Sequence, residues 1–93
     1  MAVGAAPPQS SSVPRISVKQ DADGRLAQLG AGIRAMREKA GLSQEALADA
    51  AGVDRSHMSR IERGKRNVSI LNVCRIADAL ACKPSDILIA GSL

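Results

Sequence analysis

The stretch SQEALADAAGVDRSHMSRIERG, residues 43–64, decides the fold of this chain. It contains two short helical patterns that meet at Gly52. Ser43 and Asp54 are residue types favoured at the N-cap of a helix. Glycine takes the positive φ that lets a chain leave one helix and turn sharply into the next. The stretch therefore predicts two short helices joined by a tight turn.

Small and apolar residues give these two helices matching faces. Ala48 is small where the helices would cross closely, and Val53 lies in the turn. The expected contact residues are Leu47, Ala48 and Ala51 from the first helix and Val53, Met58 and Ile61 from the turn and the second helix. This is the spacing of a helix-turn-helix motif.

The opposite face of the second helix is polar and basic. At about 100° per residue, Met58 and Ile61 share one side of the helix. The other side is an arc of about 140° that holds no acidic residue and contains Arg55, Ser56, Ser59, Arg60 and Arg63. Arginine donates two parallel hydrogen bonds to the O6 and N7 atoms of guanine, and serine is short enough to permit close approach. This face is suited to the major groove of B-DNA.

Helical periodicity continues on both sides of this stretch. Apolar residues at three- and four-residue steps predict a first helix from Asp23 to Gly41 and a fourth helix that Ser69 caps. Their inner faces are Leu26, Leu29, Ile33 and Met36, and Ile70, Val73, Ile76, Ala77 and Leu80. Pro84 suits the first turn of a short fifth helix. We expect a compact all-α domain of five helices over residues 23–93.

Residues 1–22 differ in composition and predict a flexible arm, because they are rich in Pro, Ser, Ala and Gly. Within them, RISVK alternates as a short strand does. The prolines also interrupt any apolar segment that would serve as an export signal. Because residue 1 is Met, we expect the chain not to be a domain cut from a longer protein.

Composition excludes several classes of function. The 93 residues include no Phe, Trp or Tyr, which argues against modules that stack single-stranded bases. A single His and two Cys provide neither a metal cluster nor a catalytic triad, so we expect no enzyme, no cofactor and no metal. We expect Cys74 and Cys82 to be reduced core residues. The net charge of +4 is concentrated between Arg55 and Arg66 and fits nucleic acid.

Residues 26–88 resemble the helix-turn-helix family of phage Cro and repressor proteins, the XRE family. The resemblance is carried by GLSQEALA, then AGV, then SRIERGKR, which are specific as a set. It implies a fold like that of the lambda repressor DNA-binding domain. The short fifth helix and the lack of a ligand domain make the chain similar to controller proteins of restriction–modification systems.

The resemblance also implies residue roles by position. Gln44, Arg55, Ser56, Ser59 and Arg60 would contact bases, and Arg37 and Glu62 would form an ion pair that holds the base-contacting helix. The resemblance places Arg63, Lys65, Arg66 and Asn67 where the following loop meets phosphates. Apart from the resemblance, we also expect phosphate contacts from Ser43 and from His57, which lies at the edge of the arc and would contact phosphate or solvent. The chain departs from the family pattern at Ala81, where a glycine is usual, and at Lys83, which replaces the usual capping residue.

We therefore expect a cytoplasmic transcription regulator, a repressor or controller, that binds a palindromic operator in double-stranded DNA as a homodimer. RNA polymerase is a further expected partner, and a membrane is not. The apolar tail predicts a dimer contact through Ile87, Leu88 and Ile89. The alternative is an antitoxin-like module whose main role is to bind a partner protein.

Overall fold

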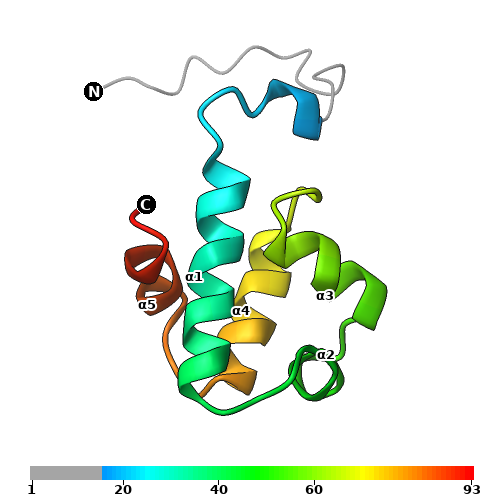
Figure 1. Ribbon diagram of the computed structural model, residues 1–93, viewed down its shortest axis with the longest axis vertical. Helices are drawn as coiled ribbons and strands as arrows, with labels where there is room; N and C mark the ends of the chain where they lie inside the picture. Colours follow the sequence, from blue (N-terminus) through cyan, green and yellow to red (C-terminus); the bar gives the residue numbers. More distant parts are fainter. Residues whose placement is uncertain (1–15) are drawn as a thin grey trace, which may run out of the picture.

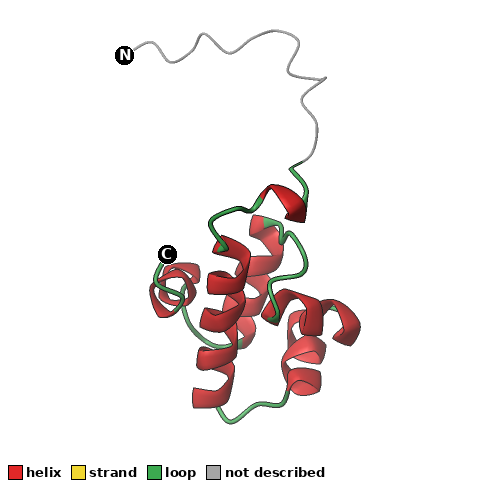
Figure 2. Cartoon of the chain, turned by 45° about the horizontal axis from the view of Figure 1, so that its top comes forward, coloured by secondary structure: helices red, strands yellow, loops and turns green. Residues whose placement is uncertain are grey.

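The computed structural model describes residues 16–93, and within that range it contains helices and no strand (Figure 2). The predicted all-α fold with five helices is confirmed. A short 3₁₀ helix, η2, precedes them. The elements are η2 (Val18–Gln20), α1 (Arg25–Lys39), α2 (Gln44–Ala51), α3 (Arg55–Glu62), α4 (Ile70–Ala79) and α5 (Pro84–Ala90).

Helix α1 is the central element of the domain. It contacts α3 on one side and α5 on the other, and α2 packs against both α3 and α4 (Figure 1). The two helices of the predicted motif, α2 and α3, therefore lie together on the side of the domain away from α5.

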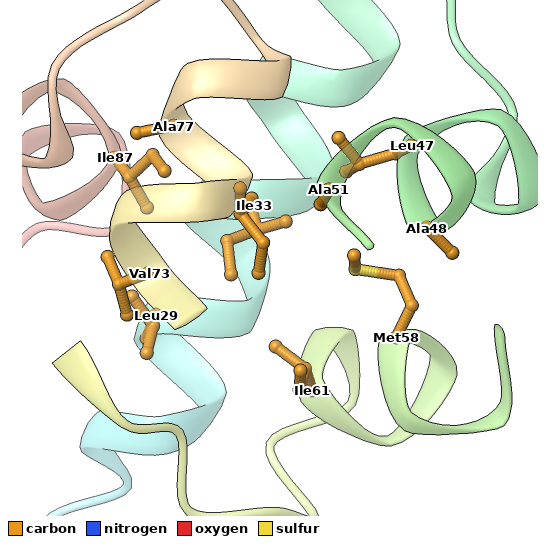
Figure 3. Close-up of a cluster of buried hydrophobic side chains, with 11 residues drawn as sticks. Leu29, Ile33, Leu47, Ala48, Ala51, Met58, Ile61, Val73, Ala77 and Ile87 are labelled. Atoms are coloured by element: carbon orange, nitrogen blue, oxygen red, sulfur yellow. The ribbon is translucent and has the colours of Figure 1, made fainter. Parts of the chain in front are cut away.

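One apolar cluster joins all five helices. Met58 and Ile61 of α3 extend toward the core that α1 and α2 line (Figure 3). The buried members are Leu29, Ile33, Leu47, Ala48, Ala51, Met58, Ile61, Val73, Ile76, Ala77 and Ile87. Burying one large aliphatic side chain contributes about 1.5–3 kcal/mol to folding. Met58 and Ile61 therefore fix the orientation of α3 through its contacts with both α1 and α2.

Local signals place the helix ends. The Ser43 hydroxyl accepts a hydrogen bond from the Ala46 amide at 3.0 Å, and the Ser69 hydroxyl accepts one from the Asn72 amide at 3.1 Å. Gly52 ends α2 with φ of 69°, in the left-handed region that glycine reaches without a Cβ clash. The tight turn between α2 and α3 is thus built as the sequence predicts.

Two glycines of α1 permit a closer approach than any other residue would. A Cβ atom on Gly30 would lie 2.7 Å from the carbonyl carbon of Glu62, at the end of α3. A Cβ atom on Gly32 would lie 2.8 Å from the amide nitrogen of Gly91, just after α5. Gly30 and Gly32 are two residues apart, which is about 200° around a helix with about 100° per residue. Their two contacts therefore lie on opposite sides of α1.

The structure corrects the predictions for Ile70 and for the segment RISVK. Ile70 was assigned to the inner face of α4 but is 68% exposed, because it occupies the first turn, beyond the edge of the core. The alternating segment RISVK forms no strand over its described residues; Val18 instead starts η2. Of the predicted arm, residues 1–15 lie outside the described residues.

The structure shows the backbone conformation at Ala81 and the backbone hydrogen bond at Lys83, the two departures from the family pattern. Ala81 adopts φ of 56°, the left-handed conformation for which a glycine is usual. The backbone amide of Lys83 is capped from within α5, since it donates to the Asp86 carboxylate at 2.9 Å. Both helix ends therefore form without the usual residues.

Candidate nucleic-acid interface

Helix α3 turns its basic face to solvent. Met58 and Ile61 are buried, whereas Arg55, Ser56 and Arg60 are exposed. Ser59, on the same arc, and His57 are half-buried. An α-helix with exposed arginines and short side chains has the width and the donors needed to enter a major groove.

Glu62, the acid within the basic run, points away from that surface. Its side chain is 3% exposed and that of Arg37 is 12% exposed. Arg37 donates from Nε to Glu62 Oε2 at 2.7 Å and from Nη2 to Glu62 Oε1 at 3.0 Å. The same guanidinium donates to the Leu42 carbonyl oxygen at 2.9 Å. The pair that the resemblance implies therefore links α1, the loop before α2, and the end of α3.

Gln44 belongs to the same network. Its Nε2 donates to Glu62 Oε1 at 2.9 Å, so the first residue of α2 is joined to the last residue of α3. The hydrogen bonds with Glu62 raise the pKa of the Arg37 guanidinium, and burial opposes that shift in part. Arg37 thus stays charged, and it forms the ion pair with Glu62 inside the domain.

The loop after α3 presents the predicted phosphate contacts. Arg63, Lys65, Arg66 and Asn67 are all exposed. The Asn67 side-chain amide donates to the Ile16 carbonyl oxygen at 3.0 Å, which brings the segment before α1 beside this loop. Because this loop directly follows α3, its exposed cationic groups adjoin the exposed arginines of that helix in the chain.

This geometry can be compared with known proteins. The helix-turn-helix family model matches residues 33–87, which run from α1 to α5. The chain belongs to the helix-turn-helix family. This family, in its XRE type, consists of DNA-binding regulators, so the basic surface on α3 and the following loop lies on a DNA-binding fold.

Individual relatives are controller proteins and a gene regulator. The chain is 43% identical over 60 residues to the control protein C.BamHI of Bacillus amyloliquefaciens, a match that covers 63% of this chain and 74% of that protein. It is 44% identical to the crystal structure of the restriction–modification controller protein C.AhdI from Aeromonas hydrophila, with a TM-score of 0.66 and coverage of 67% and 94%.

A second solved structure of the helix-turn-helix family extends the comparison. The crystal structure of the clp gene regulator ClgR from C. glutamicum is 31% identical, with a TM-score of 0.70. The match covers 73% of this chain and 88% of that one. The fold is thus shared with a restriction–modification controller protein and with a clp gene regulator.

Among residues 16–93, no group of three His, Cys, Asp or Glu side chains is placed to hold a metal ion. In the same range, no helix is both long and apolar enough to cross a membrane. Cys74 and Cys82 are free thiols and are half-buried. Burial, and secondarily the charge of Asp86, raise the pKa of the Cys82 thiol.

One residue at the start of α3, Asp54, has a role that its position in the sequence did not predict. Asp54 was predicted only to cap α3, but its carboxylate caps no backbone amide and instead accepts a hydrogen bond from the Ser56 hydroxyl. The spacing Asp-x-Ser at a helix start was the available signal, because it places a hydroxyl donor two residues after a carboxylate acceptor.

Proposed function

We propose that this protein is a transcription regulator that binds a palindromic operator as a homodimer and acts in the cytoplasm. Each protomer would place α3 in a major groove, with the two grooves one helical turn apart on the same side of the DNA. The supporting observation is the division of charge on α3: the arginines are exposed, and Glu62 is buried against Arg37.

Base contacts and phosphate contacts would be divided between α3 and its surroundings. Arg55 and Arg60 are the proposed guanine contacts, because an exposed arginine on a groove-facing helix can donate to O6 and N7 together. Gln44, Ser56 and Ser59 complete the proposed base-contacting set. Phosphate contacts, which position the protein without selecting sequence, are proposed for Ser43, His57, Arg63, Lys65, Arg66 and Asn67.

A binding-site selection with purified protein tests the base contacts. It should yield a palindromic sequence, and alanine at Arg55 or Arg60 should relax the preference at one base pair in each half-site. A bidentate arginine–guanine contact is worth about 1–3 kcal/mol of discrimination. Affinity for non-specific DNA should fall much less. If neither variant changed the selected sequence, these arginines would contact only the backbone.

The proposed dimer contact rests on the apolar residues of α5. Leu88 and Ile89 are 37% and 73% exposed, and Leu93 just beyond them is 46% exposed. Ile87 is 0% exposed in its own protomer, so its predicted place in the contact is corrected: it belongs to the core. Exposed aliphatic side chains that lie close together often mark a contact between subunits.

Sedimentation at micromolar concentration tests this contact. Leu88→Asp should give a folded monomer, since a carboxylate in an apolar contact is strongly unfavourable. The matched control is Leu71→Asp, because Leu71 is 70% exposed on α4 and lies outside the proposed contact. If Leu71→Asp were a monomer and Leu88→Asp remained a dimer, the proposal would be wrong and the interface would lie on α4.

Bound near a promoter, such a dimer would block RNA polymerase or, as a controller, also recruit it. A transcription assay with a promoter that contains the selected operator separates these outcomes. Repression alone indicates exclusion of the polymerase. Activation at low protein concentration that turns to repression at high concentration indicates both recruitment and exclusion of the polymerase. No effect on a promoter with the bound operator would contradict the regulatory role.

A further inference from the structure

Asp54 occupies the N-cap position of α3, directly before the exposed arginine Arg55. An aspartate at this position normally accepts a hydrogen bond from the amide of the second or third helical residue. Here the carboxylate makes no such bond, and its partner is the hydroxyl of Ser56. The acid is therefore used to orient a side chain on the surface proposed to meet DNA.

The direction of this hydrogen bond is determined by chemistry. An ionised carboxylate can only accept, so the Ser56 hydroxyl must donate. Serine has one hydroxyl hydrogen and two acceptor lone pairs. With its hydrogen committed to Asp54, Ser56 presents only an acceptor to a ligand. Both residues are exposed, and Ser56 lies on the same arc of α3 as Arg55 and Arg60.

In the major groove, each base pair presents one exocyclic amine that donates, and it presents a keto oxygen and a purine N7 that accept. The donors are the exocyclic amines, N6 of adenine and N4 of cytosine, and the keto oxygens are O4 of thymine and O6 of guanine. A free serine hydroxyl bonds to either kind of group. A serine whose hydrogen is already donated bonds only to the amine, and to neither the keto oxygen nor the purine N7.

We propose that Asp54 holds Ser56 as an obligate acceptor, so that Ser56 selects the exocyclic amine of an adenine or a cytosine. Asp54 is in this sense a positioning residue, because it determines which group of a base pair can form a hydrogen bond with Ser56. The inference rests on the proposed entry of α3 into the major groove. It adds a contact of opposite polarity to those of the arginines, which only donate.

Ser59 provides a matched control on the same helix. It lies on the same arc, and among the hydrogen bonds of residues 16–93 its hydroxyl has no partner. Its hydrogen is therefore free to be donated. Ser59 has no reason to prefer an amine over a keto oxygen.

The experiment begins with the base pair whose preference relaxes in the Ser56→Ala variant during binding-site selection. Two modified operators are then made at that pair. In one, the amine is deleted by replacing adenine with unsubstituted purine, or cytosine with a pyrimidinone that lacks the amine. In the other, the keto oxygen of the partner base is deleted. Affinities are measured by fluorescence anisotropy with labelled duplexes.

Deleting the amine should weaken binding of the wild-type protein by about two- to tenfold, which corresponds to one hydrogen bond. The same deletion should cost the Ser56→Ala variant nothing further. Deleting the keto oxygen should affect both proteins equally. A loss that depends on Ser56 when the keto oxygen is removed would overturn the proposal, because Ser56 would then be a donor.

The role of Asp54 is tested with Asp54→Gly, because glycine is tolerated at the N-cap and removes the only acceptor that Asp54 offers to the Ser56 hydroxyl. The Ser56 hydroxyl can then donate as well as accept. Binding-site selection with this variant should therefore accept a keto oxygen as well as an amine at the base pair that Ser56 contacts. Ser59→Ala should leave the preference at that base pair as in the wild type. A strict requirement for the amine in Asp54→Gly would refute the positioning role.

Failure of this inference is distinguishable from failure of the proposed function. A wild-type protein that selects no sequence at all would contradict both. A protein that selects an operator but shows no Ser56-dependent base pair would contradict only the role of Ser56.

Discussion

Removing the Arg37 side chain should destabilise the domain far more than removing a neighbouring arginine. In Arg37→Ala, the Glu62 carboxylate, 3% exposed, loses both guanidinium hydrogen bonds and keeps only that from Gln44. Breaking a buried ion pair in this way costs about 3–5 kcal/mol. Because a domain is typically stable by about 5–15 kcal/mol, the variant should lose a large share of its stability.

Arg34→Ala is the control, since Arg34 also lies on α1 and also pairs with a glutamate. Its bond to Glu38 is made by side chains that are 64% and 58% exposed. Exposed pairs of this kind contribute at most about 0.5 kcal/mol. Both variants replace an arginine with alanine in the same helix, so helix propensity cancels in the comparison.

The assay is urea unfolding followed by far-ultraviolet circular dichroism, because the chain has no aromatic residue to report by fluorescence. Arg37→Ala should be less stable than Arg34→Ala by at least about 2 kcal/mol. The raised pKa of Arg37 implies that its contribution is present at neutral pH and is lost only in strongly alkaline solution. Equal stabilities of the two variants would refute the importance assigned to the buried pair.

Three further predictions concern single side chains. Ala81→Gly should stabilise the fold by about 0.5–1 kcal/mol, because φ of 56° strains an alanine; a lower melting temperature would contradict this. Lys65→Ala should weaken binding to all DNA sequences alike and reduce the salt dependence by about one phosphate contact, whereas a loss limited to the operator would indicate a base contact. The raised pKa of Cys82 should slow its alkylation at neutral pH relative to the unfolded chain, which mass spectrometry can follow; equal rates would argue against it.

Features with a local cause could be predicted from the sequence. Ser43 and Ser69 cap their helices because a serine hydroxyl needs only the amides of the next turn. Gly52 ends α2 for an equally local reason. The outward face of α3 follows from the positions of Met58 and Ile61, since a helix eight residues long can bury only one side.

Features with a tertiary cause could not be predicted in this way. Ile70 fits the periodicity of α4, but periodicity does not say where the core ends, and the side chain lies beyond it. The tight packing at Gly30 has no apolar signature, because what matters there is the absence of a side chain. The turn of Asp54 toward Ser56 involves two acceptable local partners for one carboxylate, and the sequence does not choose between them.

The glycines of α1 have a consequence for how the domain folds. Gly30 and Gly32 each lower the intrinsic stability of a helix by roughly 1 kcal/mol relative to alanine, and a 15-residue helix is marginal in water even without them. What they gain is backbone contact with the end of α3 on one side and with the segment after α5 on the other. The central helix is therefore weak alone and depends on both neighbours, so α3 and α5 should form and melt with it in one cooperative transition.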